Sequence, residues 1–204
     1  MGQRLTALFV WGAFLLYAPL PVSGRSKQID GIDQLCRDIV AEFPDGPSLV
    51  FSGPNPWTEI DAPPPEMTEG AWAYVYAEGP GIRWVFLREV GPGVSWLEDT
   101  NYFYREDGTL AKRQRNLSAF KSNINLDVTG YYDPDGKLLK EITRHHALAG
   151  KRENTSTFAD HEPPLFPSTS DVPFSDDPSL IRRLANVHSD GQSPAQVLIV
   201  FRAS

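Results

Sequence analysis

The sequence YFYREDGTLAK at residues 102–112 has a close counterpart in GYYDPDGKLLK at residues 130–140. Both stretches follow the pattern Tyr-x-x-Asp-Gly-x-Leu-x-Lys. An Asp-Gly pair between two β-forming runs is a strong hairpin signal, because glycine adopts the positive φ that a tight connection requires. The two stretches therefore predict two β-hairpins near the middle of the chain.

The second copy also predicts the length of its loop, because proline, aspartate and glycine follow one another at residues 134–136. Proline presets φ for the first loop position, and glycine takes a left-handed conformation at a bulge. This three-residue loop places Tyr132 opposite Leu138, and the same loop in the first copy places Tyr104 opposite Leu110. The register predicts two sets of side chains, one on each side of the sheet: Tyr104, Leu110, Tyr132 and Leu138 on one, and Phe103, Ala111, Tyr131 and Leu139 on the other.

Further β-forming runs surround the hairpins. Strands are predicted at about 48–52, 71–77, 82–90 and 94–105, and others flank the two turns as far as His146. Gly-Pro-Gly turns separate several of them. Consecutive short strands joined by tight turns are typical of an antiparallel meander.

An amphipathic helix is predicted between Lys27 and Phe43, with Pro44 just beyond its end. Its polar side is acidic, which favours packing on the sheet over binding to an anionic membrane surface. Cys36 is the single cysteine of the chain. It lies on the apolar side of this helix and is predicted to be a buried thiol.

These elements predict an α+β fold: an N-terminal amphipathic helix packed on a curved antiparallel β-meander, with a C-terminal strand at 197–201 returning to the sheet. Proline-rich loops are expected at about 53–70, anchored by Trp57, and at 149–179. A short helix is expected at 180–187. The mature chain, residues 25–204, is expected to form a single domain.

Residues 1–24 have the features of a secretory signal peptide. Arg4 supplies a positive charge, an apolar run follows from Leu5 to Leu20, and small residues precede a predicted cleavage after Gly24. The protein is therefore expected to be secreted or periplasmic, without a membrane span after cleavage. A retained anchor is the alternative, although the apolar run is shorter than the roughly 20 residues that span a bilayer.

The two hairpins resemble the Tyr-Asp (YD/RHS-type) repeats of large bacterial secreted shell proteins. The resemblance rests on two motifs: Tyr132-Asp133-x-x-Gly136-x-Leu138 and Tyr102-x-Tyr104-x-x-x-Gly108-x-Leu110. In that family each copy is a hairpin, and many copies wind into a sheet. The first copy here has Arg105 where the family has aspartate. The resemblance implies hairpin structure alone, since no residue of the pattern is catalytic in the family.

Charge is distributed unevenly along the chain. The formal net charge is −7, yet residues 105–152 contain ten Lys or Arg and only six Asp or Glu. This segment supplies a candidate anion- or polysaccharide-binding face: Lys112, Arg113, Arg115, Lys140 and Arg144. The alternative is that these residues are solvated strand edges, where lysine blocks aggregation. Nucleic acid is not an expected partner of an exported acidic protein.

Motifs for catalysis are scarce. The sequence contains no nucleophile elbow, phosphate loop or dinucleotide fingerprint, so no cofactor is predicted. His145 and His146 are adjacent in a predicted strand and therefore point to opposite faces, which argues against a metal site formed with Asp160 and His161. Paired carboxylates for sugar hydrolysis are the remaining catalytic candidates: Glu98, Asp99, Asp127 and Glu141.

Aromatic residues occur on successive predicted strands, and most are expected in the core. Five are candidates for lining a ligand-binding face: Trp72, Tyr74, Tyr76, Trp84 and Trp96. The leading hypothesis is an exported, non-catalytic binding or interaction module with an aromatic-lined or basic sheet face, binding a glycan, a lipid or a protein surface. The alternative is a small secreted hydrolase. Asn116 and Asn154 fit the N-glycosylation pattern.

Overall fold

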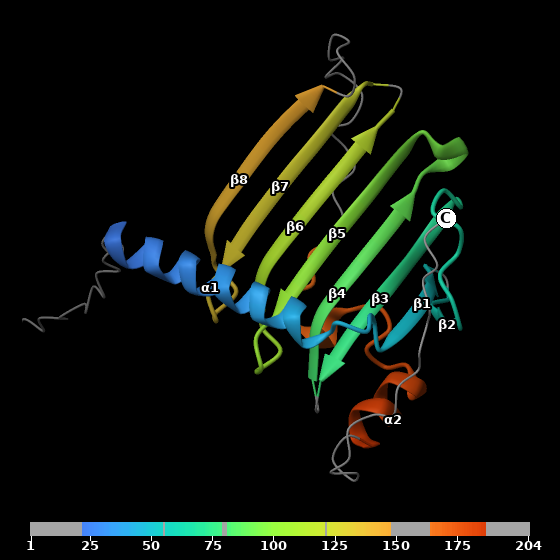
Figure 1. Ribbon diagram of the computed structural model, residues 1–204, viewed down its shortest axis with the longest axis horizontal. Coiled ribbons are helices and arrows are strands. Elements are labelled where there is room, and N and C mark those ends of the chain that lie inside the picture. Colours follow the sequence, from blue (N-terminus) through green and yellow to red (C-terminus); the bar gives the residue numbers. More distant parts are fainter. Residues whose placement is uncertain (1–21, 55, 79–80, 121, 148–163, 187–204) are drawn as a thin grey trace, which may run out of the picture.

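The computed structural model describes residues 22–54, 56–78, 81–120, 122–147 and 164–186. Eight strands form one antiparallel sheet in the order β2-β1-β3-β4-β5-β6-β7-β8 (Figure 1). The strands are β1 (Leu49–Gly53), β2 (Thr58–Glu59), β3 (Gly70–Glu78), β4 (Gly81–Val90), β5 (Trp96–Tyr104), β6 (Leu110–Ala119), β7 (Ile124–Tyr132) and β8 (Leu138–Ala147). From β3 onward each strand pairs with the next one in the sequence, so the predicted antiparallel meander is confirmed.

Both Asp-Gly hairpins have the predicted register. In each turn the residue before the loop donates its N–H to the carbonyl of the residue after it: Arg105 to Thr109 at 2.9 Å, and Asp133 to Lys137 at 3.0 Å. One step further along the strands come the two predicted aromatic–leucine pairs: Tyr104 with Leu110, and Tyr132 with Leu138. The three-residue loop is therefore used twice.

Glycine and a register shift shape each turn. Gly108 and Gly136 have φ values of +80° and +79°, the left-handed region that glycine adopts without a steric penalty. A register shift follows each turn and leaves Ala111 and Leu139 as extra residues in β6 and β8. Both side chains pack in the same apolar cluster as Tyr131, on the side predicted from the sequence.

Helix α1 (Val22–Glu42) lies across one side of the sheet, called here the helix face (Figure 1). It begins five residues before the predicted start at Lys27. Ile32, Cys36 and Ile39 are buried against the sheet. Burial raises the pKa of the Cys36 thiol to about 12, so the predicted buried cysteine is also an unreactive one.

The opposite side, the strap face, carries residues 164–177, called the strap, and helix α2 (Pro178–Asn186). The strap contains the short 3-10 helix η3 (Thr169–Asp171), and a second one, η1 (Pro92–Val94), precedes β5. Phe174 stacks on Phe51 with ring centroids 4.7 Å apart. The hydroxyl of Tyr102 donates to the carbonyl of Pro164 at 2.7 Å, and the backbone N–H of Leu110 donates to Pro167. This face carries the larger apolar core.

The loop predicted at 53–70 is mostly irregular, but the expectation of no regular structure there is wrong at Thr58–Glu59, which pairs with β1 as β2. Trp57 packs against Phe174 with ring centroids 5.5 Å apart, which confirms it as an anchor. The helix predicted at 180–187 is present as α2.

Several predictions fall on parts of the chain outside the described residues. These are the signal peptide up to residue 21, the loop at 148–163 and the returning strand at 197–201. Within the described ranges, neither helix is both long enough and apolar enough to cross a bilayer.

Candidate functional site

The helix face is built from rows of side chains, because alternate residues of each strand point to the same side. The row nearest the two Asp-Gly turns is largely aromatic. Tyr76 stacks on Trp84 with ring centroids 3.9 Å apart, and Trp84 stacks on Phe103 at 5.6 Å. The row continues into Lys112 and Tyr131 beneath α1. Contact with the helix makes this row part of the smaller core.

Two further rows cross the same face farther from the turns, and this region is called the open face. In Figure 1, α1 crosses the sheet near the turn ends of the strands, and no other described element covers the rest of this side. The register defines the rows: Tyr74, Phe86, Asn101, Gln114, Thr129 and Ile142 in one, and Trp72, Arg88, Asp99, Asn116, Asp127 and Arg144 in the other.

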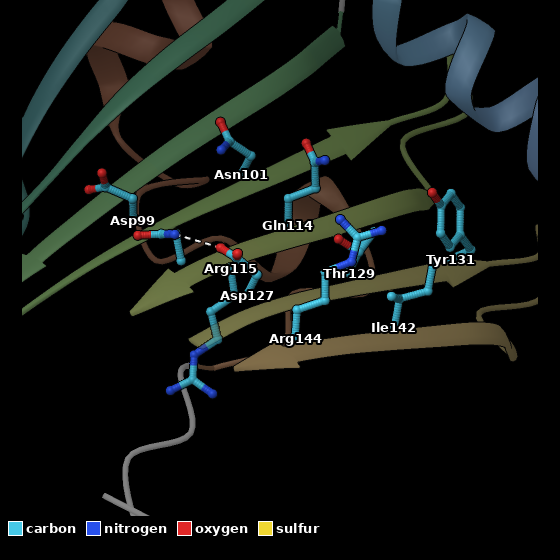
Figure 2. Close-up of a pocket in the computed structure, with 10 residues that line it drawn as sticks. Asp99, Asn101, Gln114, Arg115, Asp127, Thr129, Tyr131, Ile142 and Arg144 are labelled. Atoms are coloured by element: carbon cyan, nitrogen blue, oxygen red, sulfur yellow. Dashed lines mark hydrogen bonds between the residues drawn. The ribbon is translucent and has the colours of Figure 1, made fainter. Parts of the chain in front are cut away.

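A hollow of about 470 Å³ lies on the open face and is lined entirely by residues from β5 to β8 (Figure 2). Its lining is mostly polar: Asp99, Asn101, Gln114, Asn116, Asp127, Thr129 and Arg144, with Tyr131 and Ile142 at the end toward α1. Arg115 also borders the hollow, but its guanidinium points away from the other labelled side chains. Amide, carboxylate, hydroxyl and guanidinium groups from four strands thus converge on one hollow.

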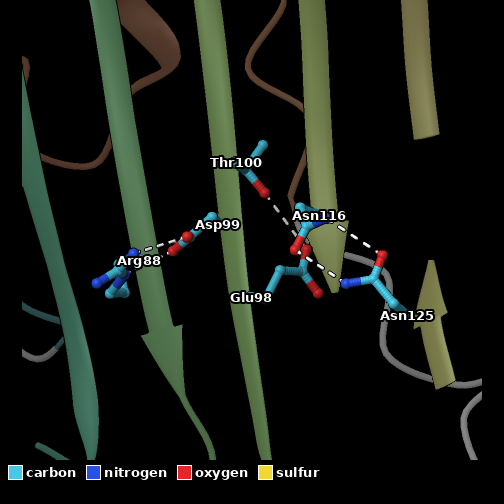
Figure 3. A network of polar contacts seen from close by, with 6 residues as sticks. All are labelled: Arg88, Glu98, Asp99, Thr100, Asn116 and Asn125. Carbon is cyan, nitrogen blue, oxygen red and sulfur yellow. Dashed lines mark hydrogen bonds and ion pairs between the residues drawn. The ribbon is translucent and has the colours of Figure 1, made fainter. Parts of the chain in front are cut away.

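A network of hydrogen bonds holds the outer row in place (Figure 3). Arg88 donates to both oxygens of Asp99, at 2.6 and 2.7 Å, and these bonds raise the pKa of its guanidinium above the ordinary value. Asn116 donates to Asp127 at 2.5 Å and exchanges longer hydrogen bonds with Asn125. The network fixes the rotamers of side chains that line the hollow.

A second hollow of about 490 Å³ lies between the open face and α1. It shares Gln114 and Tyr131 with the first hollow, so the two hollows are adjacent and are together called the trough. Lys112 lines it and lies 2.6 Å from Asp33 of α1. Burial lowers the pKa of Lys112, but the hydrogen bond to Asp33 and the nearby Cys36, Tyr131 and Asp33 together outweigh this effect, so the pKa lies above its ordinary value.

The strap face contains the most buried ion pair among the described residues. Glu98 is 1% exposed and accepts two hydrogen bonds from Arg115, at 2.8 and 3.0 Å. The hydroxyl of Thr100 donates to the same carboxylate at 3.3 Å. Because a paired, fully buried carboxylate cannot reach a substrate, Glu98 stabilises the fold and is not part of a site.

The aromatic candidates fall mainly on one face. Tyr74, Tyr76 and Trp84 are half-buried on the helix face, and Trp72 is 2% exposed there. Trp96 does not join them: it begins β5, and its ring packs on the backbone of Gly91 at the sheet edge. Tyr74 and Tyr76 therefore flank the open face, whereas Trp72 is core.

The five basic candidates do not form one surface. Lys112, Lys140 and Arg144 lie on the helix face, as their register partners show. Arg113 and Arg115 alternate with them and are directed to the strap face. Only Arg144 of the five lines the first hollow with its charged group directed toward the other labelled side chains.

The histidines and carboxylates separate in the same way. His145 and His146 point to opposite faces, as predicted, and Nε2 of His146 lies 3.3 Å from Asp127. Glu141 is exposed on the strap face. In the described parts of the chain, no three His, Cys, Asp or Glu side chains come close enough together to hold a metal ion. Asp160, His161 and Asn154 lie outside those parts.

Sequence reasoning missed the polar centre of the hollow, Asn101, Gln114 and Thr129. The hairpin register nevertheless contained enough information to predict these residues. The hairpin register places Phe103 and Tyr131 on one face, and counting back two residues from each along its strand gives Asn101 and Thr129. The same count predicts the row of Asp99 and Asp127.

Searches with this chain find no matching protein-family model, no matching curated protein and no matching solved structure. The functional assignment therefore depends on the open face itself.

Proposed function

We propose that this protein is an exported, non-catalytic binding module whose ligand lies in the trough on the open face. The observation that supports this proposal most strongly is the polar lining of the first hollow. Asn101, Gln114 and Asn116 each contribute an amide, a group that both donates and accepts hydrogen bonds. The Asn101 oxygen already accepts from Nε1 of Trp84 at 2.9 Å, and Asn116 is bonded to Asp127 and Asn125, which leaves the Asn101 NH₂ group and the Gln114 amide as the main contacts for a ligand. Thr129 adds a hydroxyl with the same double capacity. A core-facing sheet surface would instead present apolar side chains here.

The chemistry of the trough favours a glycan over a lipid. Sugar hydroxyls both donate and accept, which matches amides and hydroxyls better than it matches purely acidic or basic groups. Tyr74 and Phe86 lie beside Asn101 in the same row, with ring centroids 5.4 Å apart. Neither residue lines a hollow, but their half-buried rings lie next to Asn101 on the open face and offer an apolar surface to the C–H face of a sugar ring. A lipid chain would require an apolar cavity, and this lining is mainly polar.

The length of the trough favours an extended ligand. The two hollows have volumes of about 470 and 490 Å³ and meet at Gln114 and Tyr131. Each volume lies within the range of about 300–1,000 Å³ that is typical of small-molecule sites. An oligosaccharide of several residues therefore suits the trough better than a single sugar.

A glycoside hydrolase is the second candidate, because Asp99 and Asp127 share the open face. They are two strands apart, which corresponds to a backbone separation of roughly 10 Å. However, both oxygens of Asp99 already accept hydrogen bonds from Arg88, so this carboxylate serves as an ion-pair partner in the structure. Asn116 lies between the two carboxylates. The geometry supports binding better than acid–base catalysis.

The test is a panel of neutral and acidic oligosaccharides, screened by thermal shift and followed by calorimetric titration. At least one oligosaccharide is expected to bind. Gln114→Ala, which removes the amide shared by the two hollows, is expected to weaken that binding about tenfold. Gln28→Ala is the matched control, because Gln28 is on α1 and lines neither hollow.

No binding across the panel would contradict the proposal. An unchanged affinity of the Gln114→Ala variant would contradict the location of the site. Release of shorter sugars from the ligand by the wild-type protein would favour the hydrolase instead.

A further inference from the structure

The charged side chains around the trough differ in whether they are paired. Asp99 is paired with Arg88, and Asp33 is paired with Lys112. Asp127 lies opposite Arg144 in the sheet, but its carboxylate contacts Asn116 and His146 instead of that guanidinium. The guanidinium of Arg144 is thus the charged group of the first hollow that contacts none of these carboxylates.

Arg144 is exposed on β8, and its guanidinium is directed toward Thr129 over the hollow (Figure 2). It forms no hydrogen bond or ion pair with any of the described residues. A guanidinium presents a planar set of N–H donors that matches a carboxylate in a bidentate geometry. Arg144 therefore supplies an anion-recognising group inside a hollow that otherwise suits hydroxyl groups.

A second cation borders the other half of the trough. Arg37 of α1 lines the second hollow, and within the described residues its guanidinium donates only to the amide oxygen of Gln34. Its charge is therefore not neutralised by a carboxylate in that contact. Arg144 and Arg37 place one guanidinium in each half of the trough, beside the carboxylates of Asp99 and Asp127 in the first hollow and of Asp33 in the second.

We infer that the ligand is an acidic glycan, with a carboxylate-bearing sugar held by Arg144 and its hydroxyls held by the amides of the trough. This inference rests on the proposed function and names the ligand class. An acidic peptide is less suitable, because the hollow offers few apolar surfaces to hold peptide side chains between the carboxylates.

The probe is a tetramer of galacturonic acid, and its fully methyl-esterified form is the matched neutral ligand. The acid form is expected to bind at least about tenfold more tightly than the ester at low salt. The difference is expected to shrink as the salt concentration rises, because salt screens charge–charge attraction. Arg144→Ala is expected to abolish the preference for the acid form while retaining binding of the ester.

Arg183→Ala is the charge-matched control. Arg183 is exposed on α2, which packs on the strap face, so its loss changes the net charge equally without altering the trough. Arg144→Lys keeps the charge but loses the planar donor set, and an intermediate affinity is expected.

The outcomes separate the inference from the proposed function. Equal binding of acid and ester, with loss of both in the Gln114→Ala variant, overturns the acidic-glycan assignment and leaves the binding module in place. Equal losses in the Arg144→Ala and Arg183→Ala variants overturn the role of Arg144. Binding of a poly-glutamate peptide but of no oligosaccharide overturns both.

Discussion

Gly136→Ala isolates the energetic cost of the left-handed backbone in an Asp-Gly turn. Gly136 has a φ of +79°, and a Cβ added there meets no atom within 4 Å. The only penalty is therefore conformational, and a left-handed alanine costs about 1–2 kcal/mol. We expect the free energy of unfolding to fall by that amount.

Gly108→Ala has the same backbone cost and one additional contact. Gly108 has a φ of +80°, and an added Cβ lies 2.7 Å from Oγ1 of Thr169 in the strap. The backbone N–H of Thr169 also donates to the carbonyl of Gly108 at 3.0 Å. Relief of the overlap requires the Thr169 side chain to rotate or the strap to move, so we expect a total loss of about 2–4 kcal/mol.

Urea unfolding of both variants, followed by tryptophan fluorescence, measures the two losses. Gly136→Asn serves as a control, since asparagine tolerates the left-handed region better than alanine and is expected to lose less stability. Equal losses at Gly108 and Gly136 would mean that the strap does not press on the first turn. A Gly136→Ala variant as stable as the wild type would refute the left-handed assignment.

Three further predictions concern buried polar groups. Glu98→Gln is expected to cost about 3–5 kcal/mol in urea unfolding, because it removes the carboxylate that Arg115 binds inside the strap face. Asp33→Ala is expected to cost about 1–3 kcal/mol and to speed hydrogen exchange in α1 more than in β5, because it removes the partner of Lys112. Native Cys36 is expected to resist thiol reagents at pH 8 and to react in urea. Burial raises the pKa of the Cys36 thiol from 9.0 to about 12. The stability that the neutral buried thiol contributes is therefore complete below pH 9 and is lost between pH 9 and about 12. Alkaline unfolding of the Cys36→Ala variant should consequently be less steep.

Local chemistry was sufficient to predict the middle of the sheet. The Asp-Gly turns carry their own register, because only one loop length accommodates proline, aspartate and glycine at residues 134–136 and pairs tyrosine with leucine. The amphipathic helix was equally predictable from its spacing, but its start at Val22 was not. The predicted helix begins at Lys27, because cleavage of the signal peptide is expected shortly before it, after Gly24.

The layer arrangement was harder to predict. Phe166 and Phe174 lie in a proline-rich segment without periodicity, so nothing in the sequence indicated that this segment fills the larger core. Its position depends on hydrogen bonds from distant strands, such as Tyr102 to Pro164. Such long-range contacts leave no local pattern.

The candidate site was predicted only in part. The basic segment was read as one face, yet Arg113 and Arg115 fall on the opposite side from Lys112 and Arg144. Strand alternation alone causes this separation. Composition thus points to the segment that contains Arg144, and only the register and the side-chain direction show that its charged group faces the first hollow.

The central claim is that the open face binds the ligand, and NMR spectroscopy of the side-chain amides tests it most directly. Asn101, Gln114 and Asn116 each give a distinct NH₂ signal, and all three line the hollow. On titration with tetragalacturonate these signals are expected to shift together, while the Gln28 signal and the backbone amides of α2 stay in place. Shifts confined to the strap face, or no shift with a ligand that binds, would contradict the claim.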